Sequence, residues 1–262
     1  MSRRARRNDG PFSARHKGEP AAWAPDTPNV MALLEEAEID SCGLIPWGSN
    51  YTFLINLQHP TAGSSYAVYK PRRGEAPLGD FPEGTLYRRE RSAYLVSQAL
   101  TWDLVPPTII RDGPYGVGMV QLFVDADTNA HYFTFGPEIP DVARRVALFD
   151  CVVNNTDRKA GHLLRDCAGR VWAIDHGLTF HTAPKLRTVI WDFAGERFPS
   201  PLVRDMAALL AAFDDVDGPL CELRSLLSMR ECEALRSRIE RLIEHGCYPH
   251  PTSYRSVPWP SV

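Results

Sequence analysis

The first half of the chain is dominated by short β-rich runs. YTFLINL (51–57) and SYAVYKP (65–71) are joined by the turn-forming residues QHPTAGS, so they predict an antiparallel hairpin. Two further strands are expected at 105–110 and 117–125, on either side of the turn RDGPYG. Together these runs predict a β-rich unit.

Helical spacing of apolar residues marks most of the remaining chain. Amphipathic helices are predicted at 30–39, 85–100, 141–154, 200–215 and 228–246. Thr85 is expected to cap the second of these helices, and the last one opens with the capping box Ser228–Glu231 and ends at Gly246. Because the chain becomes mainly helical beyond residue 139, the pattern predicts an α+β protein with two lobes.

The predicted organisation has three parts. Residues 1–28 are rich in Arg, Pro, Gly and Ala, and they lack the apolar surface that offsets ordering entropy, so a disordered basic tail is expected. Residues 29–125 form the β-rich N-lobe, and residues 126–262 form the helical C-lobe.

Composition narrows the class of protein. The 262 residues are 44% apolar and carry a net charge of −3, which does not favour nucleic-acid binding. No apolar run reaches the length of a membrane-spanning helix, and no apolar core of a secretory signal follows the basic N-terminus. The six cysteines are scattered and predict reduced thiols. We therefore expect a soluble cytoplasmic protein, whose oligomeric state the sequence does not give.

Two motifs place polar residues at the edges of apolar runs. NNTDRKAGHLL (154–164) contains Asp157 and His162, and WAIDHGLTF (172–180) contains Asp175. The short runs HLL and VWAID predict two strands around the turn RDCAGR. Phosphoryl transfer needs a cation for the phosphates, carboxylates for a divalent metal, and a residue that orients the attacking hydroxyl.

The chain offers one candidate for each of these tasks. Lys70 ends the second strand of the hairpin, where it can reach phosphates, and Glu90 of the following helix can pair with it. Asp157 is positioned in a turn as a base or as a residue that orients the attacking hydroxyl, with Arg158 supporting the loop. Asp175 ends a strand just before Gly177, and this glycine is expected to let the chain turn sharply. Metal coordination is the task that suits the Asp175 carboxylate best.

These motifs, in order, carry a family resemblance. VYKP, GEAPLGDFPEGT, VPPT, NNTDRKAGHLL and AIDHGLTF with KLRT and a tryptophan resemble the phosphatidylinositol 3-/4-kinase-like superfamily, and within it the type II phosphatidylinositol 4-kinases. HipA-type toxin kinases share the N-T-D-R loop. An uncharacterised actinobacterial family described as phosphatidylinositol-kinase-like is more similar still, over about residues 33–250.

The resemblance implies a protein-kinase-like fold, ATP as cofactor, and Mg²⁺ or Mn²⁺. It also implies that Lys70 binds phosphates, Asp157 is catalytic and Asp175 binds metal. The backbone around Gln121, Phe123 and Val124 would hold the adenine, and the turn containing Ser49 is a candidate loop over the phosphates. These assignments are expectations from the family pattern.

The chain departs from the family pattern at two places. His162 stands where the superfamily has a metal-binding Asn, and an imidazole suits Mn²⁺ or a transition metal better than Mg²⁺. The cysteine-rich lipidated insert of the type II lipid kinases is absent from RRGEAPLGDFPEGT, which disfavours a membrane lipid substrate. Lys185 and Arg187 of the loop HTAPKLRT are candidates to bind a phosphorylated or acidic acceptor.

Three functions stay open on the sequence. The first is a kinase that transfers the γ-phosphoryl of ATP to a hydroxyl on a protein, an inositol lipid or a small molecule. The second keeps the fold but transfers AMP. The third is a pseudokinase that binds nucleotide without turnover and recruits a partner through its basic tail. The structural alternatives are an ion pair on a charged helix face for Glu90 and ordinary capped turns for Asp157 and Asp175.

Overall fold

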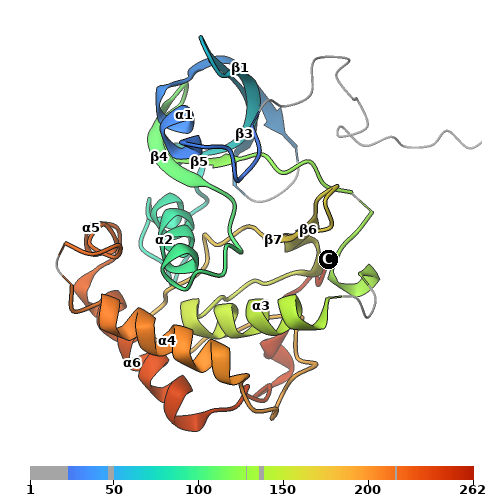
Figure 1. Ribbon diagram of the computed structural model, residues 1–262, viewed down its shortest axis with the longest axis vertical. Helices are drawn as coiled ribbons and strands as arrows, with labels where there is room; N and C mark the ends of the chain where they lie inside the picture. The colour runs from blue at the N-terminus through green and yellow to red at the C-terminus, as the bar shows by residue number, and fades with distance from the viewer. Residues whose placement is uncertain (1–22, 47–49, 128, 136–138, 216) are drawn as a thin grey trace, which may run out of the picture.

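A β-sheet lobe stands above a helical lobe in Figure 1. The computed structural model describes residues 23–46, 50–127, 129–135, 139–215 and 217–262. The α+β class, with a β-rich first lobe and a mainly helical second lobe, is confirmed.

The upper sheet is antiparallel throughout and has the strand order β1-β2-β3-β5-β4. Its strands are β1 (Glu38–Ile45), β2 (Thr52–His59), β3 (Gly63–Pro71), β4 (Thr108–Gly113) and β5 (Gly116–Leu122). The predicted hairpin is β2 with β3. β4 begins later than predicted because Pro106 and Pro107 have no N–H to donate to a sheet.

The predicted helix at 30–39 is shorter than expected. Helix α1 (Val30–Glu36) ends early, and the residues after Ala37 enter β1 at the edge of the sheet. Ile39 lies opposite Leu57 of β2, so pairing with the hairpin overrides the local helical pattern at this end of the predicted helix.

Helix α2 (Leu86–Ala99) is capped by a distant residue. The Glu75 carboxylate accepts hydrogen bonds from the backbone N–H groups of Leu86 (3.1 Å) and Tyr87 (2.8 Å). The Thr85 hydroxyl donates to the Pro82 carbonyl and makes no cap, so the predicted N-cap is wrong. A carboxylate at this end also complements the helix dipole.

The lower lobe contains the remaining helices and a small hairpin. Its elements are α3 (Pro140–Val153), β6 (Leu163–Arg165), β7 (Val171–Ala173), α4 (Ser200–Ala212), α5 (Leu223–Leu226) and α6 (Met229–His245). The predicted capping box at Ser228 and Glu231 and the stop at Gly246 are confirmed for α6. Short 3-10 helices lie at Arg72–Gly74, Tyr132–Thr134, Ala160–His162 and Tyr254–Ser256.

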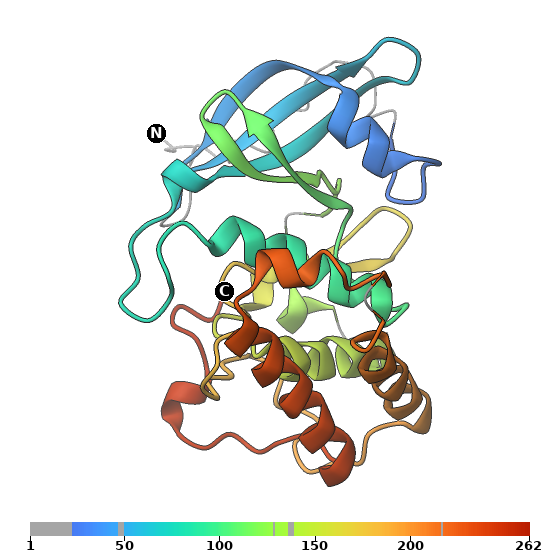
Figure 2. The ribbon, with the colours of Figure 1, turned by 90° about the vertical axis from the view of Figure 1, so that its left-hand side faces the viewer.

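Each lobe has its own hydrophobic core. One lies within the β-sheet lobe, and the other fills the helical lobe. The buried face of α2, including Ala93, Val96 and Leu100, belongs to the core of the helical lobe. Figure 2 shows α2 directly beneath the sheet, so this helix connects the lobes and can hold residues of both in one site.

The N-terminal segment differs from its prediction at residues 23–28. Trp23 is 4% exposed, and its indole N–H donates to the Ala62 carbonyl at 2.8 Å, so this residue is part of the sheet core. The rest of the predicted tail, residues 1–22, lies outside the described residues.

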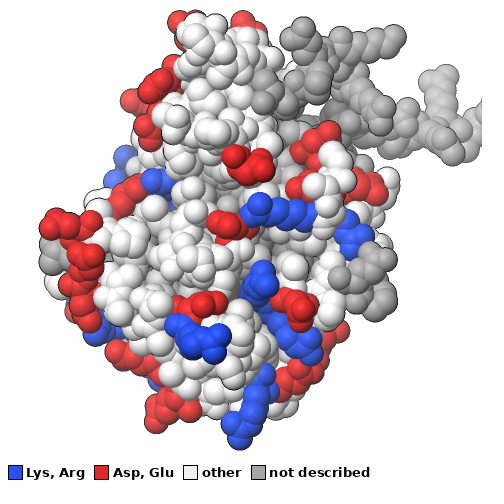
Figure 3. All heavy atoms as spheres, viewed as in Figure 1, with Lys and Arg blue, Asp and Glu red and all other residues white. Residues whose placement is uncertain are grey.

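Acidic and basic side chains are interspersed over the face drawn in Figure 3. The six cysteines are all unpaired. Within the described ranges, no helix combines the length and apolar character needed to cross a membrane.

Candidate active site

Lys70 lies at the centre of the candidate site. It occupies β3 opposite Met119 of β5, and its Nζ is 2.6 Å from Glu90 Oε1 and 2.9 Å from Asp175 Oδ1. Burial opposes the charge on Lys70, but Asp175 and Glu90 outweigh it and raise the pKa of the ammonium. Lys70 is therefore a fixed cation at the junction of the lobes.

Glu90 projects from α2 and is 1% exposed, so it is not an ion pair on a charged surface. One of its oxygens accepts from Lys70, and the other accepts from the His176 backbone N–H at 2.8 Å. The predicted contact between Lys70 and Glu90 is present, and the same carboxylate also positions the backbone next to Asp175.

Asp175 follows β7 and carries a side chain that is 44% exposed. Its backbone has φ +61°, a left-handed conformation that Asp tolerates better than most residues. The predicted sharp turn is thus made by Asp175 itself, while Gly177 lies against Leu86 of α2. Burial opposes ionisation of Asp175, but Lys70 and His162 outweigh it and lower the pKa of the carboxyl.

His162 is a hydrogen-bond donor to Asp175 in this arrangement. Its Nδ1 accepts from the Lys159 backbone N–H at 3.4 Å, which places the ring proton on Nε2, 3.2 Å from Asp175 Oδ2. Burial lowers the pKa of His162 to about 4, so the ring is neutral at pH 7. A metal ion can bind His162 Nε2 only after the proton has left this nitrogen.

Asp157 lies on the candidate catalytic loop between α3 and β6. Its backbone N–H donates to the Asn155 side-chain oxygen at 2.9 Å, so Asn155 orients the loop. The Asp157 carboxylate is partly exposed and pairs with Lys159 at 3.1 Å. Burial raises the pKa of Asp157, the Lys159 ammonium partly offsets this, and the charge of Asp175 raises it further.

Arg158 lies beneath the candidate catalytic loop, away from solvent. It and Asp150 of α3 are both 0% exposed, and the guanidinium makes three contacts of 3.0 to 3.1 Å to that carboxylate. It also donates to the Ile174 carbonyl at 2.8 Å, one residue before Asp175. Arg158 is thus enclosed by protein groups, which suits loop support and does not suit direct contact with a reacting group.

Asp150 and His176 are residues that the sequence analysis missed. The Asp150 carboxylate also accepts from the Asn155 side-chain N–H at 2.9 Å. His176 Nε2 is 2.7 Å from the Arg158 guanidinium and must accept from it, so the buried ring is neutral, and burial lowers its pKa. In the sequence, Asp150 could have been noticed as an acidic residue on the apolar face of the predicted helix.

The predicted adenine-binding segment follows β5 and connects the lobes. Gln121 lies within β5, paired with Val68 of β3 and Thr108 of β4, and its side chain donates to the Thr108 hydroxyl at 2.8 Å. The Phe123 N–H donates to the Tyr66 carbonyl. The Val124 N–H has no acceptor in the described part of the chain, which leaves it as the available donor.

The predicted loops around the site are described in part. Ser49 lies outside the described residues. Lys185 pairs with Asp80 at 2.6 Å, and the loop that holds Asp80 also places Phe81 against His181. Arg187 is exposed, and its side chain has no ion-pair partner among the described residues.

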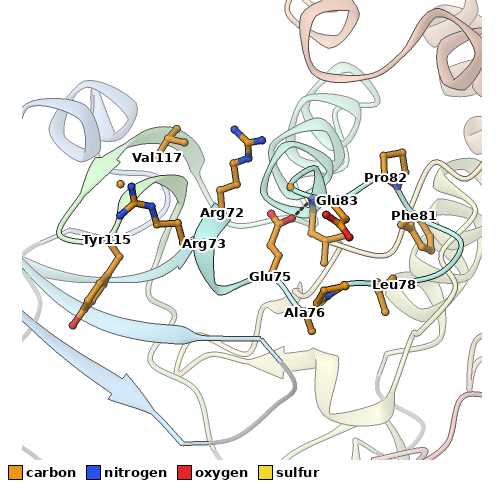
Figure 4. A pocket seen from close by; sticks show the side chains of 14 residues that line it. Arg72, Arg73, Glu75, Ala76, Leu78, Phe81, Pro82, Glu83, Tyr115 and Val117 are labelled. Atoms are coloured by element: carbon orange, nitrogen blue, oxygen red, sulfur yellow. Dashed lines mark hydrogen bonds between the residues drawn. The ribbon is translucent and has the colours of Figure 1, made fainter.

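A cavity of about 480 Å³ lies outside this site, between the β3–α2 loop and the β4–β5 turn. Figure 4 shows the arginines and glutamates that line it, together with Tyr115 and Phe81. Lys70, Asp157 and Asp175 are not among its lining residues. Its two arginines and two glutamates balance in formal charge, so we assign it no ligand.

Glu90→Gln tests the pairing of Lys70. The substitution keeps the shape of the side chain but replaces a charge-assisted hydrogen bond, so we expect the free energy of unfolding to fall by about 1.5–3 kcal/mol. Urea unfolding measures it. Glu35→Gln, at an exposed position of α1, is the matched control and should change little. Equal effects of the two substitutions would contradict the pairing.

A relative in Mycobacterium tuberculosis identifies the family. Protein Rv2133c is 41% identical to this chain, and the match covers 88% of this chain and 94% of the relative. The chain belongs to the family of Protein Rv2133c. No protein-family model matches the sequence.

Two solved structures share the fold at low sequence identity. The structure of hydra Fam20 with sugar has a TM-score of 0.54 and 13% identity, and the match covers 82% of this chain and 86% of that one. The Golgi casein kinase with Mn/ADP bound has a TM-score of 0.51 and 12% identity, over 83% and 74%. The predicted kinase-like fold is confirmed, while the narrower type II phosphatidylinositol 4-kinase branch stays a prediction.

Proposed function

We propose that this protein is an ATP-dependent phosphotransferase that transfers the γ-phosphoryl group to a hydroxyl acceptor. The observation that carries the proposal is the meeting of Lys70, Glu90 and Asp175, which come from β3, α2 and the segment after β7. A cation held by one buried acid and facing a second, exposed acid is what phosphate binding beside a metal requires. Transfer of labelled phosphate from ATP tests it.

Each residue has one task in this proposal. Lys70, held by Glu90, neutralises the α- and β-phosphates of ATP. Asp157 accepts the proton of the attacking hydroxyl, and Lys159 holds its carboxylate in place at 3.1 Å. The buried Arg158–Asp150 pair fixes the loop that presents Asp157. The Val124 N–H binds the adenine.

The donor set fits a divalent metal that arrives with the nucleotide. Within the described residues, no three His, Cys, Asp or Glu side chains come together as a metal site. Asp175 supplies one exposed carboxylate, with His162 beside it, and proteins often hold Mg²⁺ through one or two carboxylates plus substrate phosphates. Bound there, the metal would neutralise charge on the transferred group. The Golgi casein kinase structure, which contains Mn/ADP, supports this assignment.

This donor set predicts that metal binding depends on nucleotide. We expect Mn²⁺, followed by electron paramagnetic resonance, to bind at least about tenfold more tightly with ATP than without it. Asp175→Asn should remove most of that gain, while Asp141→Asn, at an exposed position of α3, should keep it. Equal Mn²⁺ affinity with and without ATP would overturn the assignment.

The acceptor carries a hydroxyl on a protein, an inositol lipid headgroup or a small molecule. Because Lys185 is already paired with Asp80, Arg187 is the better candidate to bind an acidic or phosphorylated group of that acceptor. The type II lipid kinase branch is kept here as a proposal, supported by the motif order alone.

A further inference from the structure

The end of the chain lies against the candidate catalytic loop. We call residues 257–262 the C-terminal strap. The strap begins after the buried Ser256, whose carbonyl accepts from the Thr188 N–H at 3.0 Å. It reaches the loop at Ser261, whose carbonyl accepts from the Ala160 N–H at 2.8 Å. Figures 1 and 2 both place this end at the level where the lobes meet.

Ser261 brings a hydroxyl group to the loop that carries Asp157. The side chain is half-buried, and its hydroxyl makes no hydrogen bond to another described residue. Ala160, the residue that Ser261 touches, lies three positions after Asp157, a span of at most about 11 Å between Cα atoms. A serine hydroxyl without a partner among the described residues is therefore held on the loop that carries the proposed base.

The strap is firmly held at one end and weakly at the other. Ser256 and Pro258 are buried, whereas the half-buried Ser261 is joined to the loop by one backbone hydrogen bond, worth about 0.5–1.5 kcal/mol. Trp259, at 93% exposed, adds no packing. Pro258 and Pro260 restrict the strap to few conformations, so an outer end that leaves the loop stays near it. These properties let Ser261 shift toward Asp157 at a high effective concentration.

We propose that Ser261 is a phosphoryl acceptor in cis, an inference that rests on the proposed kinase function. The Ser261 Oγ forms a bond to the γ-phosphorus of ATP, and the bond from that phosphorus to the β–γ bridging oxygen breaks. ADP leaves with that oxygen, and the serine proton passes to Asp157. The product is phosphoserine at position 261 of the same chain.

The test uses the full chain after phosphatase treatment and removal of the phosphatase. The protein is incubated with ATP and Mn²⁺, and phosphate is located by peptide mass spectrometry. A pool of acidic and basic serine peptides provides an external acceptor in the same assay. We expect phosphate on Ser261, at a rate constant that does not change over a tenfold range of protein concentration. Ser261→Ala should lose this phosphate, and Ser253→Ala, at an exposed position just before the strap, should keep it.

Each outcome separates this proposal from the function on which it rests. Phosphate on external peptides with none on Ser261 overturns the cis acceptor and leaves the kinase function standing. A rate constant that rises in proportion to protein concentration indicates transfer between chains and also overturns it. Absence of phosphate on Ser261 and on the peptides overturns the cis acceptor, and transfer of γ-label to phosphoinositide vesicles or cell extract then decides the kinase function separately. The Asp157→Asn variant should leave Ser261 unmodified; phosphate there at the wild-type rate would contradict the role of the base.

Discussion

Replacing Asp157 with Asn is expected to lower phosphoryl transfer by about 10²–10⁴-fold, because the amide cannot accept the proton of the attacking hydroxyl. ATP affinity should stay within about twofold of the wild type, since the phosphates are proposed to bind Lys70. The burial of Asp157 raises the pKa of its carboxyl, which makes it a better proton acceptor than an exposed Asp. Single-turnover transfer and equilibrium binding of ATP measure the two quantities separately.

Asp141→Asn is the control for this result, since Asp141 is an exposed acid at the start of α3. It should change neither quantity. If Asp157→Asn lowers ATP binding as much as transfer, Asp157 has a metal-binding or structural role and is not the base. If it changes neither, the loop is not catalytic.

The second large effect is expected on stability. Asp150→Asn leaves the Arg158 guanidinium buried without its counter-charge, so the free energy of unfolding should fall by about 3–5 kcal/mol. Urea unfolding should show a lower midpoint with an unchanged slope. Substitution of both partners, Asp150→Leu with Arg158→Met, should cost less than Asp150→Asn, because no unpaired charge remains.

An ion pair on the surface provides the control for the buried Arg158–Asp150 pair. Arg236 and Asp214 lie 2.7 Å apart, with side chains 43% and 68% exposed. Asp214→Asn should lower stability far less than Asp150→Asn does, because water and salt screen an exposed pair. Similar losses for Asp150→Asn and Asp214→Asn would mean that the buried pair does not support the loop.

Local pattern was sufficient for the elements that carry the site. Lys70 ends a run typical of a strand, and Glu90 lies on a helix with clear apolar spacing, so their elements could be predicted. Their contact was a prediction from the order of these elements. The structure supports it because α2 packs on the helical lobe and turns Glu90 toward the sheet.

Partners distant in the sequence could not be predicted from local pattern. Glu75 caps α2 from eleven residues before Leu86, while the adjacent Thr85 looked like the natural cap. Likewise, Asp150 lies within an apolar helix face, and only the fold shows that Arg158 meets it there.

The backbone at Asp175 is a similar case. A glycine two residues later indicated a turn, but the left-handed conformation belongs to Asp175 itself. Glu90 and Arg158 bind the backbone on either side of this residue, at His176 and Ile174. Tertiary contacts thus fix a conformation that sequence pattern assigned to Gly177.

The most direct test of the central claim uses ATP labelled separately at the γ and α positions. The wild-type chain is incubated with each, with Mg²⁺ and then Mn²⁺, using cell extract and phosphoinositide vesicles as acceptors. The proposed function predicts that γ-label moves to an acceptor and that α-label does not. Transfer of α-label would indicate AMP transfer. Bound ATP with no transfer of either label would mean that the site binds nucleotide without phosphoryl transfer.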